Sequence, residues 1–320
     1  MDRRRFVGGA LAGLAAFSSS AAVAAPKVGD VPKRTFGKTG ENLTIIGQAG
    51  GRFPLCQDFE EAKAVTQRAY ELGLNYFDNA RSYWDGRSEE VYGAVLPPYR
   101  KEVFITTKST KRGRQEAEAE LHQSLKALKT DYVDLWQIHS IREMEEVDQI
   151  FGPGGAIEAF EAAKKAGKAR FIGFTGHHDP HVHKAMLDRY DDYDTILMPL
   201  NPADPSYLSF ETIVLPEAQK RNLGIQGMKS TANAKLLQSI SVRQCLSYVL
   251  SLPIHCLAVG ATTVGQIEDD VRIAQEFEPM AKEEMAELRE RAKPLAGPQL
   301  EDWKRDVQNA GIPRREYVGG

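Results

Sequence analysis

The stretch Val103-Phe104-Ile105-Thr106-Thr107-Lys108 is a short apolar, β-rich run that ends on a lysine. A helical pattern at Gln115–Leu128 follows it, and a second β-rich run, Tyr132–His139, ends on a histidine. Strands that alternate with amphipathic helices indicate parallel strands joined by helical crossovers. Because this strand–helix–strand unit recurs about every 30 residues along the chain, it decides the fold.

Eight such runs alternate with eight helical patterns, which predicts an α/β fold: a TIM (β/α)8 barrel with an outer ring of helices. An open doubly wound sheet is the alternative, but its dinucleotide turn has a Gly-x-Gly-x-x-Gly spacing that residues 47–51 lack. The predicted strands are Leu43–Gly47, Asn75–Asp78, Val103–Lys108, Tyr132–His139, Ala169–Thr175, Thr195–Leu200, Gly224–Met228 and Cys256–Val259. The predicted helices are Glu60–Leu72, Ser88–Leu96, Gln115–Leu128, Ala156–Ala166, His181–Tyr190, Phe210–Arg221, Val242–Ser251 and Gly265–Phe277.

Segments before and after the barrel strands extend the predicted domain, which covers residues 25–320. Residues 34–42 read as a short hairpin that plugs the amino-terminal end of the barrel. The C-terminal tail covers residues 278–320 and includes a charged helix, Lys282–Arg291. The tail residues expected to pack on the barrel are Leu300, Trp303 and Tyr317.

Residues 1–24 have the pattern of an export signal. Three arginines precede Phe6, a mild apolar stretch runs to Phe17, and Ala22-Val23-Ala24 follows. Two arginines, any residue and Phe form the pattern that the twin-arginine export machinery recognises. The apolar stretch is too short to span a membrane, so stable membrane insertion is not expected. We expect a periplasmic protein that starts near Ala25; a frayed Ala-rich helix is the alternative.

Charge and cysteine content argue against several kinds of partner. Removing residues 1–24 takes away three Arg and one Asp and changes the formal charge from −3 to −5. No basic block of five or more residues remains, so nucleic acid is not an expected partner. The three cysteines, Cys56, Cys245 and Cys256, are odd in number and widely spaced, which indicates neither a disulfide framework nor a metal site.

Four side chains lie at or just after the predicted strand ends: Asp78, Tyr83, Lys108 and His139. The carboxyl ends of parallel barrel strands meet on one face, where barrel enzymes place their active sites. A phenol, an ammonium, a carboxylate and an imidazole are the groups needed to transfer a proton to a carbonyl oxygen. A buried structural ion pair between Asp78 and Lys108 is the alternative.

These residues carry a resemblance to the aldo-keto reductases, from about Arg34 to Phe277. Tyr76-Phe77-Asp78-Asn79-Ala80-Arg81-Ser82-Tyr83 is similar to that family's aspartate–tyrosine segment. The hairpin, the helix start at Gly86–Glu90 and the lysine and histidine strands match in the same order. The twin-arginine leader and the run Phe174–Asp179 indicate a divergent exported branch.

The resemblance implies the role of each group and a cofactor. Tyr83 is then the general acid, Lys108 stabilises its phenolate and Asp78 holds Lys108. His139 either orients the carbonyl oxygen or assists the proton transfer. The family binds NAD or NADP in an extended pose without a Rossmann domain, and the substrate is a small carbonyl compound or the matching alcohol. The implied cofactor-binding residues are Thr175, Lys229, Gly260, Ala261, Thr262, Thr263, Gln266, Asp269 and Asp270.

The choice between NAD and NADP stays open. A 2′-phosphate favours a nearby Arg or Lys, and the positions where the family often carries one read Gly260, Ala261 and Gln266. Asp269 and Asp270 add negative charge, which weakly favours NAD.

The sequence departs from the family at the nicotinamide and at the substrate pocket. The usual Ser-Asn pair after the fifth strand reads Thr175-Gly176, and the amide-binding glutamine of the sixth strand reads Leu197. His177 or His178 is the candidate for the missing contact, and Asn201 faces the same end of the barrel. The predicted substrate-binding residues are Trp84, His177 and Asn201. Trp84 is expected either to bind a sugar-like substrate or to cover the second helix. Together with Trp303 it hints at a sugar-like substrate.

His177, His178, His181 and His183 form a cluster, but no metal site is expected there. Asp179-Pro180 is a good helix start, and a helix from that point places His181 and His183 on different faces. The expected function is a carbonyl oxidoreductase. The alternatives are a non-catalytic cofactor-binding or regulatory module and a metal-dependent barrel hydrolase that would use the histidine cluster.

Overall fold

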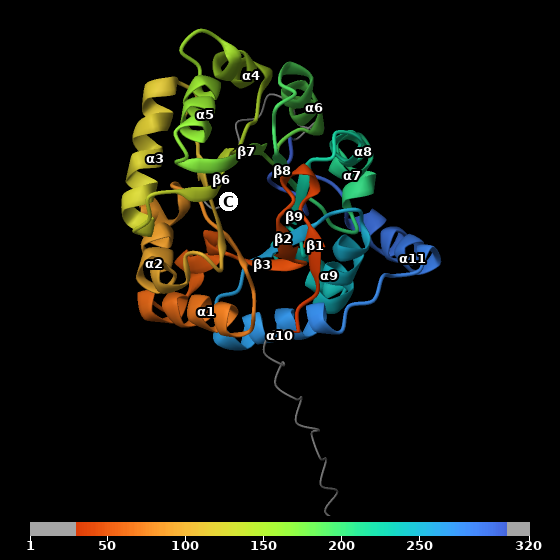
Figure 1. Cartoon of the computed structure of the whole chain (residues 1–320). Helices are drawn as coiled ribbons and strands as arrows, with labels where there is room; N and C mark the ends of the chain where they lie inside the picture. Colours follow the sequence, from red (N-terminus) through yellow and green to blue (C-terminus); the bar gives the residue numbers. More distant parts are fainter. Residues whose placement is uncertain (1–29, 306–320) are drawn as a thin grey trace, which may run out of the picture.

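Eight parallel strands close into a barrel in the computed structural model, which describes residues 30–305. Each strand pairs with its neighbours in sequence order, and the last strand closes on the first, so the predicted TIM barrel is confirmed (Figure 1). The barrel strands are β3 (Ile46–Ala49), β4 (Tyr76–Asp78), β5 (Phe104–Ser109), β6 (Val133–Ile138), β7 (Ala169–Thr175), β8 (Thr195–Pro199), β9 (Gly224–Met228) and β10 (Cys256–Val259).

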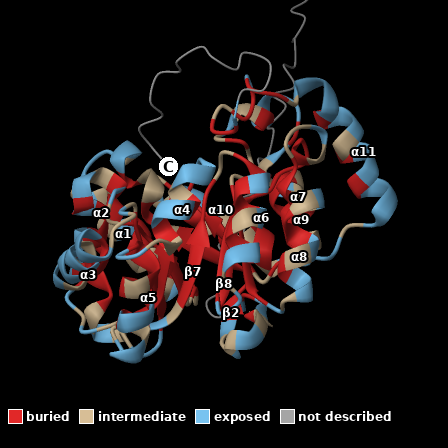
Figure 2. Ribbon diagram, turned by 90° about the horizontal axis from the view of Figure 1, so that it is seen from above, coloured by how far each residue is buried: buried red, intermediate tan, exposed pale blue. Residues whose placement is uncertain are grey.

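A ring of helices covers the outside of the barrel. Figure 2 shows the buried strands inside and exposed residues on the outer faces of the helices. Helix α1 is typical: Asp58 caps its first turn, and Ala62, Val65 and Ala69 are buried at helical spacing. The helices that follow barrel strands are α1 (Phe59–Glu71), α2 (Arg87–Val95), α3 (Arg114–Leu128), α5 (Ala156–Lys165), α6 (Pro180–Arg189), α7 (Phe210–Ile213), α8 (Leu215–Lys220), α9 (Val242–Ser251) and α10 (Val264–Gln275).

Three details differ from the sequence-based prediction. The predicted first strand, Leu43–Gly47, is two strands: a bend at Ile45 separates β2 (Asn42–Thr44) from β3. The predicted helix Phe210–Arg221 is broken at Val214, because Pro216 in the first turn of α8 has no N–H to continue the ladder. An additional helix, α4 (Met144–Phe151), lies between β6 and α5.

The predicted N-terminal hairpin closes the amino-terminal end of the barrel. β1 (Lys33–Thr35) pairs antiparallel with β2, and the backbone N–H of Lys38 donates to the carbonyl of Asn222 at 2.8 Å. Phe36 is buried against Phe104, with ring centroids 5.8 Å apart. Gly37 has φ 52°, and a Cβ there would lie 2.4 Å from the backbone of Leu223. The close approach therefore requires glycine.

The C-terminal segment returns to the opposite, carboxyl-terminal side of the barrel. After α11 (Lys282–Ala292), the chain buries Leu300 and Trp303, as predicted. Lys304 is fully buried, where its ammonium pairs with Asp204 at 2.7 Å. The predicted contact of Tyr317 and the proposed signal at residues 1–24 lie outside the described residues. Within residues 30–305, no helix is both long and apolar enough to cross a membrane.

Candidate active site

The structure brings the four predicted catalytic side chains together at the carboxyl-terminal end of the barrel. Asp78 ends β4, Lys108 lies on β5, His139 follows β6, and Tyr83 begins a short 3-10 turn, η3 (Tyr83–Gly86). Lys108 Nζ donates to Asp78 Oδ2 at 2.7 Å and to the carbonyl of Asn79 at 2.7 Å. Tyr83 Oη lies 3.5 Å from the same nitrogen. The phenol and the ammonium therefore share one site.

Burial and nearby charges compete at Lys108. Desolvation lowers the pKa of the Lys108 ammonium, and the carboxylates of Asp78 and Glu89 oppose this shift. The two acceptors at 2.7 Å take up two of the three ammonium protons, which favours the charged form. The third proton is available to the oxygen of Tyr83.

Burial and nearby positive charges favour the neutral form of His139. Burial, and then the positive charges of Lys108 and Arg112, hold the pKa of this imidazole well below its ordinary value. Its Nδ1 lies 3.3 Å from the hydroxyl of Ser82, and its ring packs edge-on against Tyr83 with centroids 5.5 Å apart. Its Nε2 is buried and finds no hydrogen-bond partner among residues 30–305.

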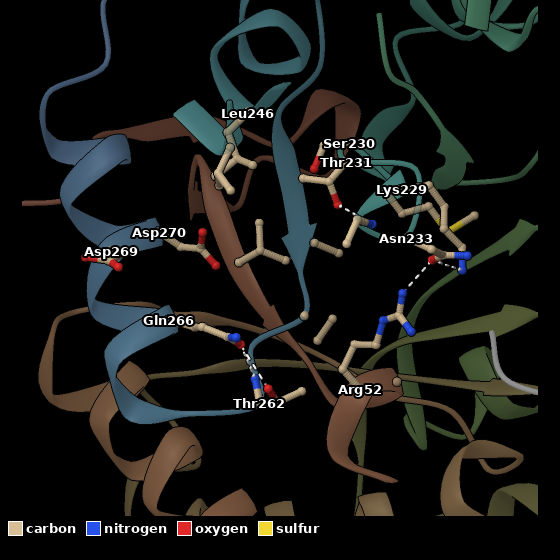
Figure 3. Close-up of a pocket in the computed structure, with 18 of the residues that line it drawn as sticks. Arg52, Lys229, Ser230, Thr231, Asn233, Leu246, Thr262, Gln266, Asp269 and Asp270 are labelled. Carbon is tan, nitrogen blue, oxygen red and sulfur yellow. Dashed lines mark hydrogen bonds between the residues drawn. The ribbon is translucent and has the colours of Figure 1, made fainter. Parts of the chain in front are cut away.

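A cavity of about 620 Å³ joins this tetrad to the start of α10. Asp78 and Tyr83 line it, as do residues that follow β3 and β9 and side chains of α10. Figure 3 shows Arg52, Lys229 and Asn233 on one side of the cavity and Thr262, Gln266 and Asp270 on the other. Ligand pockets of about 300–1,000 Å³ accommodate small molecules and cofactors. The volume of this cavity lies within that range.

The predicted phosphate segment, Gly260-Ala261-Thr262-Thr263, connects β10 to α10. Thr263 caps the helix by accepting from the backbone N–H of Gln266 at 3.3 Å. The side-chain oxygen of Gln266 accepts from the backbone N–H of Thr262 at 2.8 Å (Figure 3). The loop is thus fixed by its own side chains, and Gly260 and Thr262 both face the cavity.

The acidic pair on α10 has two different environments. Asp269 is exposed and accepts from Arg272 at 2.6 Å. Burial, reinforced by the charge of Asp269, raises the pKa of Asp270 to about 7. Both carboxylates line the cavity, as predicted from the sequence.

Two basic residues meet in the cavity wall, and sequence reasoning found only one of them. Lys229 directly follows β9, and burial and then the charge of Arg52 lower its pKa to about 7. The side-chain oxygen of Asn233 accepts from Arg52 at 2.6 Å and from Lys229 at 3.1 Å (Figure 3). Arg52 comes three residues after β3 ends, in the segment that follows the first barrel strand. This position at the carboxyl end of a barrel strand is the sequence feature that could have identified it. Sequence reasoning also missed Asn233, Arg243 and Arg272, which line the cavity.

The predicted substrate residues lie in three different settings. Trp84 packs against Phe59 and Arg87, with its ring 4.3 Å from the Arg87 guanidinium, and it is not among the cavity-lining residues. Asn201 is buried, and its side-chain N–H donates to Glu301 at 3.0 Å. Of these three residues, only His177 has a side-chain nitrogen that is buried without a hydrogen-bond partner among residues 30–305.

His177 lies close to the catalytic groups. Burial lowers its pKa well below the ordinary value, and the charge of Lys229 acts in the same direction. Thr175 ends β7, and its hydroxyl is buried without a partner among residues 30–305. Leu197, at the predicted glutamine position, lines the cavity with an apolar side chain.

The histidine cluster does not converge. His183 is fully buried, packed against Phe174 and Phe210, whereas His181 is exposed and contacts Asp179. The two histidines occupy different faces of α6, as predicted. Over residues 30–305, no group of three or more His, Cys, Asp or Glu side chains is placed to hold a metal ion.

A closed parallel barrel with a Tyr–Lys–Asp–His site at the carboxyl ends of its strands defines a narrow class of proteins. The profile of the Aldo/keto reductase family matches residues 50–243, more than half of the chain. The chain therefore belongs to the aldo/keto reductase family. Methylglyoxal reductase YeaE of Escherichia coli is 35% identical over 103 residues, which are 31% of this chain and 36% of that protein. The chain thus matches little more than a third of the length of this relative.

Solved structures extend the similarity of fold to most of the chain. Aldo-keto reductase AKR11C1 from Bacillus halodurans, in its holo form, superimposes with a TM-score of 0.71 at 23% identity, over 85% of this chain and 99% of that chain. An aldo-keto reductase from Klebsiella pneumoniae, solved in complex with NADPH, gives a TM-score of 0.67 at 20% identity, over 82% and 95%. At these identities the likeness establishes the fold.

Proposed function

We propose that the chain is a nicotinamide-dependent oxidoreductase that reduces an aldehyde or ketone to an alcohol, or catalyses the reverse reaction. The observation that carries this proposal is the 3.5 Å separation between Tyr83 Oη and Lys108 Nζ beside a cavity of about 620 Å³. Family membership and the methylglyoxal reductase relative support the same class of reaction.

Carbonyl reduction adds a hydride to carbon and a proton to oxygen. A reduced nicotinamide supplies the hydride when it is bound. Tyr83 supplies the proton, and the ammonium of Lys108 stabilises the phenolate that remains. Asp78 keeps Lys108 charged and in place at 2.7 Å. In the reverse direction, the same phenolate accepts the proton of the alcohol.

His139 orients the carbonyl oxygen. When the Ser82 hydroxyl, 3.3 Å from Nδ1, donates to that nitrogen, the ring proton lies on Nε2. Nε2 then donates a hydrogen bond to the carbonyl oxygen, where negative charge develops as hydride arrives. Because the ring is neutral, it does not compete with Lys108 for Tyr83.

The cavity fits a nicotinamide dinucleotide by its donor set. The side-chain oxygen of Asn233 accepts from both Arg52 and Lys229, which brings the two basic side chains together in the cavity wall. Such a pair of cations suits the pyrophosphate, and the capped start of α10 suits the adenosine end. The buried hydroxyl of Thr175 and Nε2 of His177 supply polar contacts close to the tetrad.

Either NAD or NADP is the proposed cofactor. The absence of Lys and Arg from positions 260–263 favours NAD, whereas Arg272 on the cavity wall favours the phosphorylated form. Titration of both reduced dinucleotides by quenching of protein fluorescence decides between them. A tenfold or greater difference in Kd identifies the physiological form, and binding of neither contradicts the proposal.

The test of function is a screen of aldehydes, ketones and sugars with both reduced cofactors. The proposal expects substrate-dependent loss of absorbance at the nicotinamide band, and a rate at least about 100-fold lower for Tyr83→Phe. Turnover that Tyr83→Phe leaves unchanged would mean that another group is the acid.

A cofactor-binding or regulatory subunit without catalytic turnover is the second candidate. Leu197 offers no hydrogen bond to a nicotinamide amide, and the amide of Asn201 is already engaged by Glu301. Stopped-flow mixing of the protein–cofactor complex with carbonyl compounds separates the candidates. Tight dinucleotide binding with no oxidation by any carbonyl supports the second candidate and contradicts the first.

We also propose that the protein is exported to the periplasm by the twin-arginine route. The motif of three arginines, Phe6 and Ala22-Val23-Ala24 supports this proposal. Replacing Arg3, Arg4 and Arg5 by Lys is expected to retain the protein in the cytoplasm at full length. A native protein whose first residue is Met1 would contradict export with cleavage.

A further inference from the structure

The turn that carries Tyr83 has an unusual backbone. Trp84 and Asp85 both have φ 51°, a left-handed conformation that residues with a Cβ rarely adopt, and Gly86 follows with φ 87°. Such strained conformations persist only where contacts with the surrounding structure hold them in place. The position of the phenol therefore depends on whatever holds this turn.

The side chain of Arg81 lies across the turn. Its Nη2 is 3.4 Å from the carbonyl oxygen of Asp85. A Cβ on Gly86 would lie 1.7 Å from the same nitrogen, so glycine leaves the space that the guanidinium occupies. Its other terminal nitrogen, Nη1, donates to the carboxylate of Glu89 at 2.6 Å.

Glu89 lies on α2 with a fully buried side chain and links two catalytic segments. One carboxylate oxygen accepts from Arg81, in the segment that carries Tyr83. The other accepts from the Thr107 hydroxyl at 2.6 Å, and Thr107 directly precedes Lys108 on β5. A single carboxylate therefore connects the phenol's loop to the ammonium's strand.

We propose that Glu89 is a positioning residue that sets the separation between Tyr83 Oη and Lys108 Nζ through Arg81 and Thr107. The role rests on the proposed carbonyl chemistry. The backbone supports it, because the N–H of Arg81 donates to the carbonyl of Lys108 at 3.1 Å. The carboxylate also opposes the fall in the pKa of Lys108 that burial causes.

The test is Glu89→Gln, with Glu90→Gln as the matched control, because Glu90 is the neighbouring residue and is exposed. The readout is the ultraviolet titration of the Tyr83 phenol, obtained by difference from Tyr83→Phe in each background. Loss of positioning moves the phenol away from the ammonium, so the phenol titrates at higher pH in Glu89→Gln. Loss of a nearby negative charge alone shifts the titration to lower pH.

The direct loss of charge and the loss of positioning have opposite signs, and Thr107→Val, which keeps the carboxylate of Glu89, separates positioning from any change in the charge of Lys108. The proposal is supported if the Tyr83 phenol titrates at higher pH in Glu89→Gln but not in Glu90→Gln. A fall, or no change, overturns it. In turnover we expect kcat to fall at least tenfold, while the Kd of the dinucleotide stays within twofold.

Thr107 provides a second route should Glu89→Gln not fold. Thr107→Val removes the hydroxyl that joins Glu89 to β5 and keeps the side-chain shape, whereas Thr107→Ser keeps the hydroxyl. We expect Thr107→Val to raise the pH at which the Tyr83 phenol titrates, and Thr107→Ser to keep it at the value of the unchanged protein. Equal titration of the two variants overturns the proposal. Because the titration needs no turnover, inactivity of the unchanged protein would refute the carbonyl chemistry and leave this positioning test intact.

Discussion

Replacing Lys108 by Met tests whether its buried ion pair serves catalysis or only the fold. The ammonium and the carboxylate of Asp78 are 2.7 Å apart, and their side chains are 0% and 3% exposed. Removing one partner leaves a buried, unpaired charge, which costs about 3–5 kcal/mol. We expect Lys108→Met to lower the free energy of unfolding in urea by that amount. The control is Lys184→Met, whose half-exposed pair with Asp188 is worth less than about 1 kcal/mol.

A second substitution, Asp78→Asn, separates the two roles. It neutralises the charge left by Lys108→Met, and replacing a buried ion pair by neutral groups is often close to neutral for stability. We therefore expect the double variant to recover most of the lost unfolding free energy. Carbonyl reduction at saturating cofactor should remain at least about 100-fold below that of the unchanged protein, because no ammonium stands beside Tyr83. A double variant that recovered both stability and activity would refute the catalytic role of the pair.

Other parts of the structure give further predictions. Arg52→Gln should raise the Kd of either dinucleotide at least tenfold with little change in kcat, as measured by fluorescence titration; an unchanged Kd would place the pyrophosphate elsewhere. Because the pKa of Lys229 is lowered to about 7, its charge is lost as pH rises above that value. Dinucleotide affinity should therefore fall above about pH 7, and Lys229→Met should flatten this dependence. Lys304→Met leaves the buried carboxylates of Asp204 and Glu301 without their cationic partner. It should lower the free energy of unfolding in urea by about 3–5 kcal/mol. A change below about 1 kcal/mol would show that water solvates these carboxylates.

The barrel and the tetrad could be predicted because both depend on local order along the chain. Each strand–helix unit has its own hydrophobic period, and parallel strands bring their carboxyl ends to one face. Asp78, Lys108 and His139 occupy strand ends, so a correct strand assignment was enough to place them together. The pairing of β4 with β5 and of β5 with β6 then sets the distances between these side chains.

Contacts between distant segments could not be predicted in this way. Arg52 and Asn233 are 181 positions apart, and Asn201 meets Glu301 across 100 positions. No periodicity records such pairs. The direction of Trp84 depends on a left-handed backbone that no sequence rule assigns to tryptophan. Side-chain direction in a strained turn is a property of the packed structure.

Single-turnover oxidation of bound reduced nicotinamide by a carbonyl substrate, compared between the unchanged protein and Tyr83→Phe, tests the central claim most directly. The substitution removes one hydroxyl, 3.5 Å from the ammonium of Lys108, and little volume. The account predicts that cofactor binding persists and that the oxidation rate falls at least about 100-fold. An undiminished rate would contradict the assignment of Tyr83 as the proton donor.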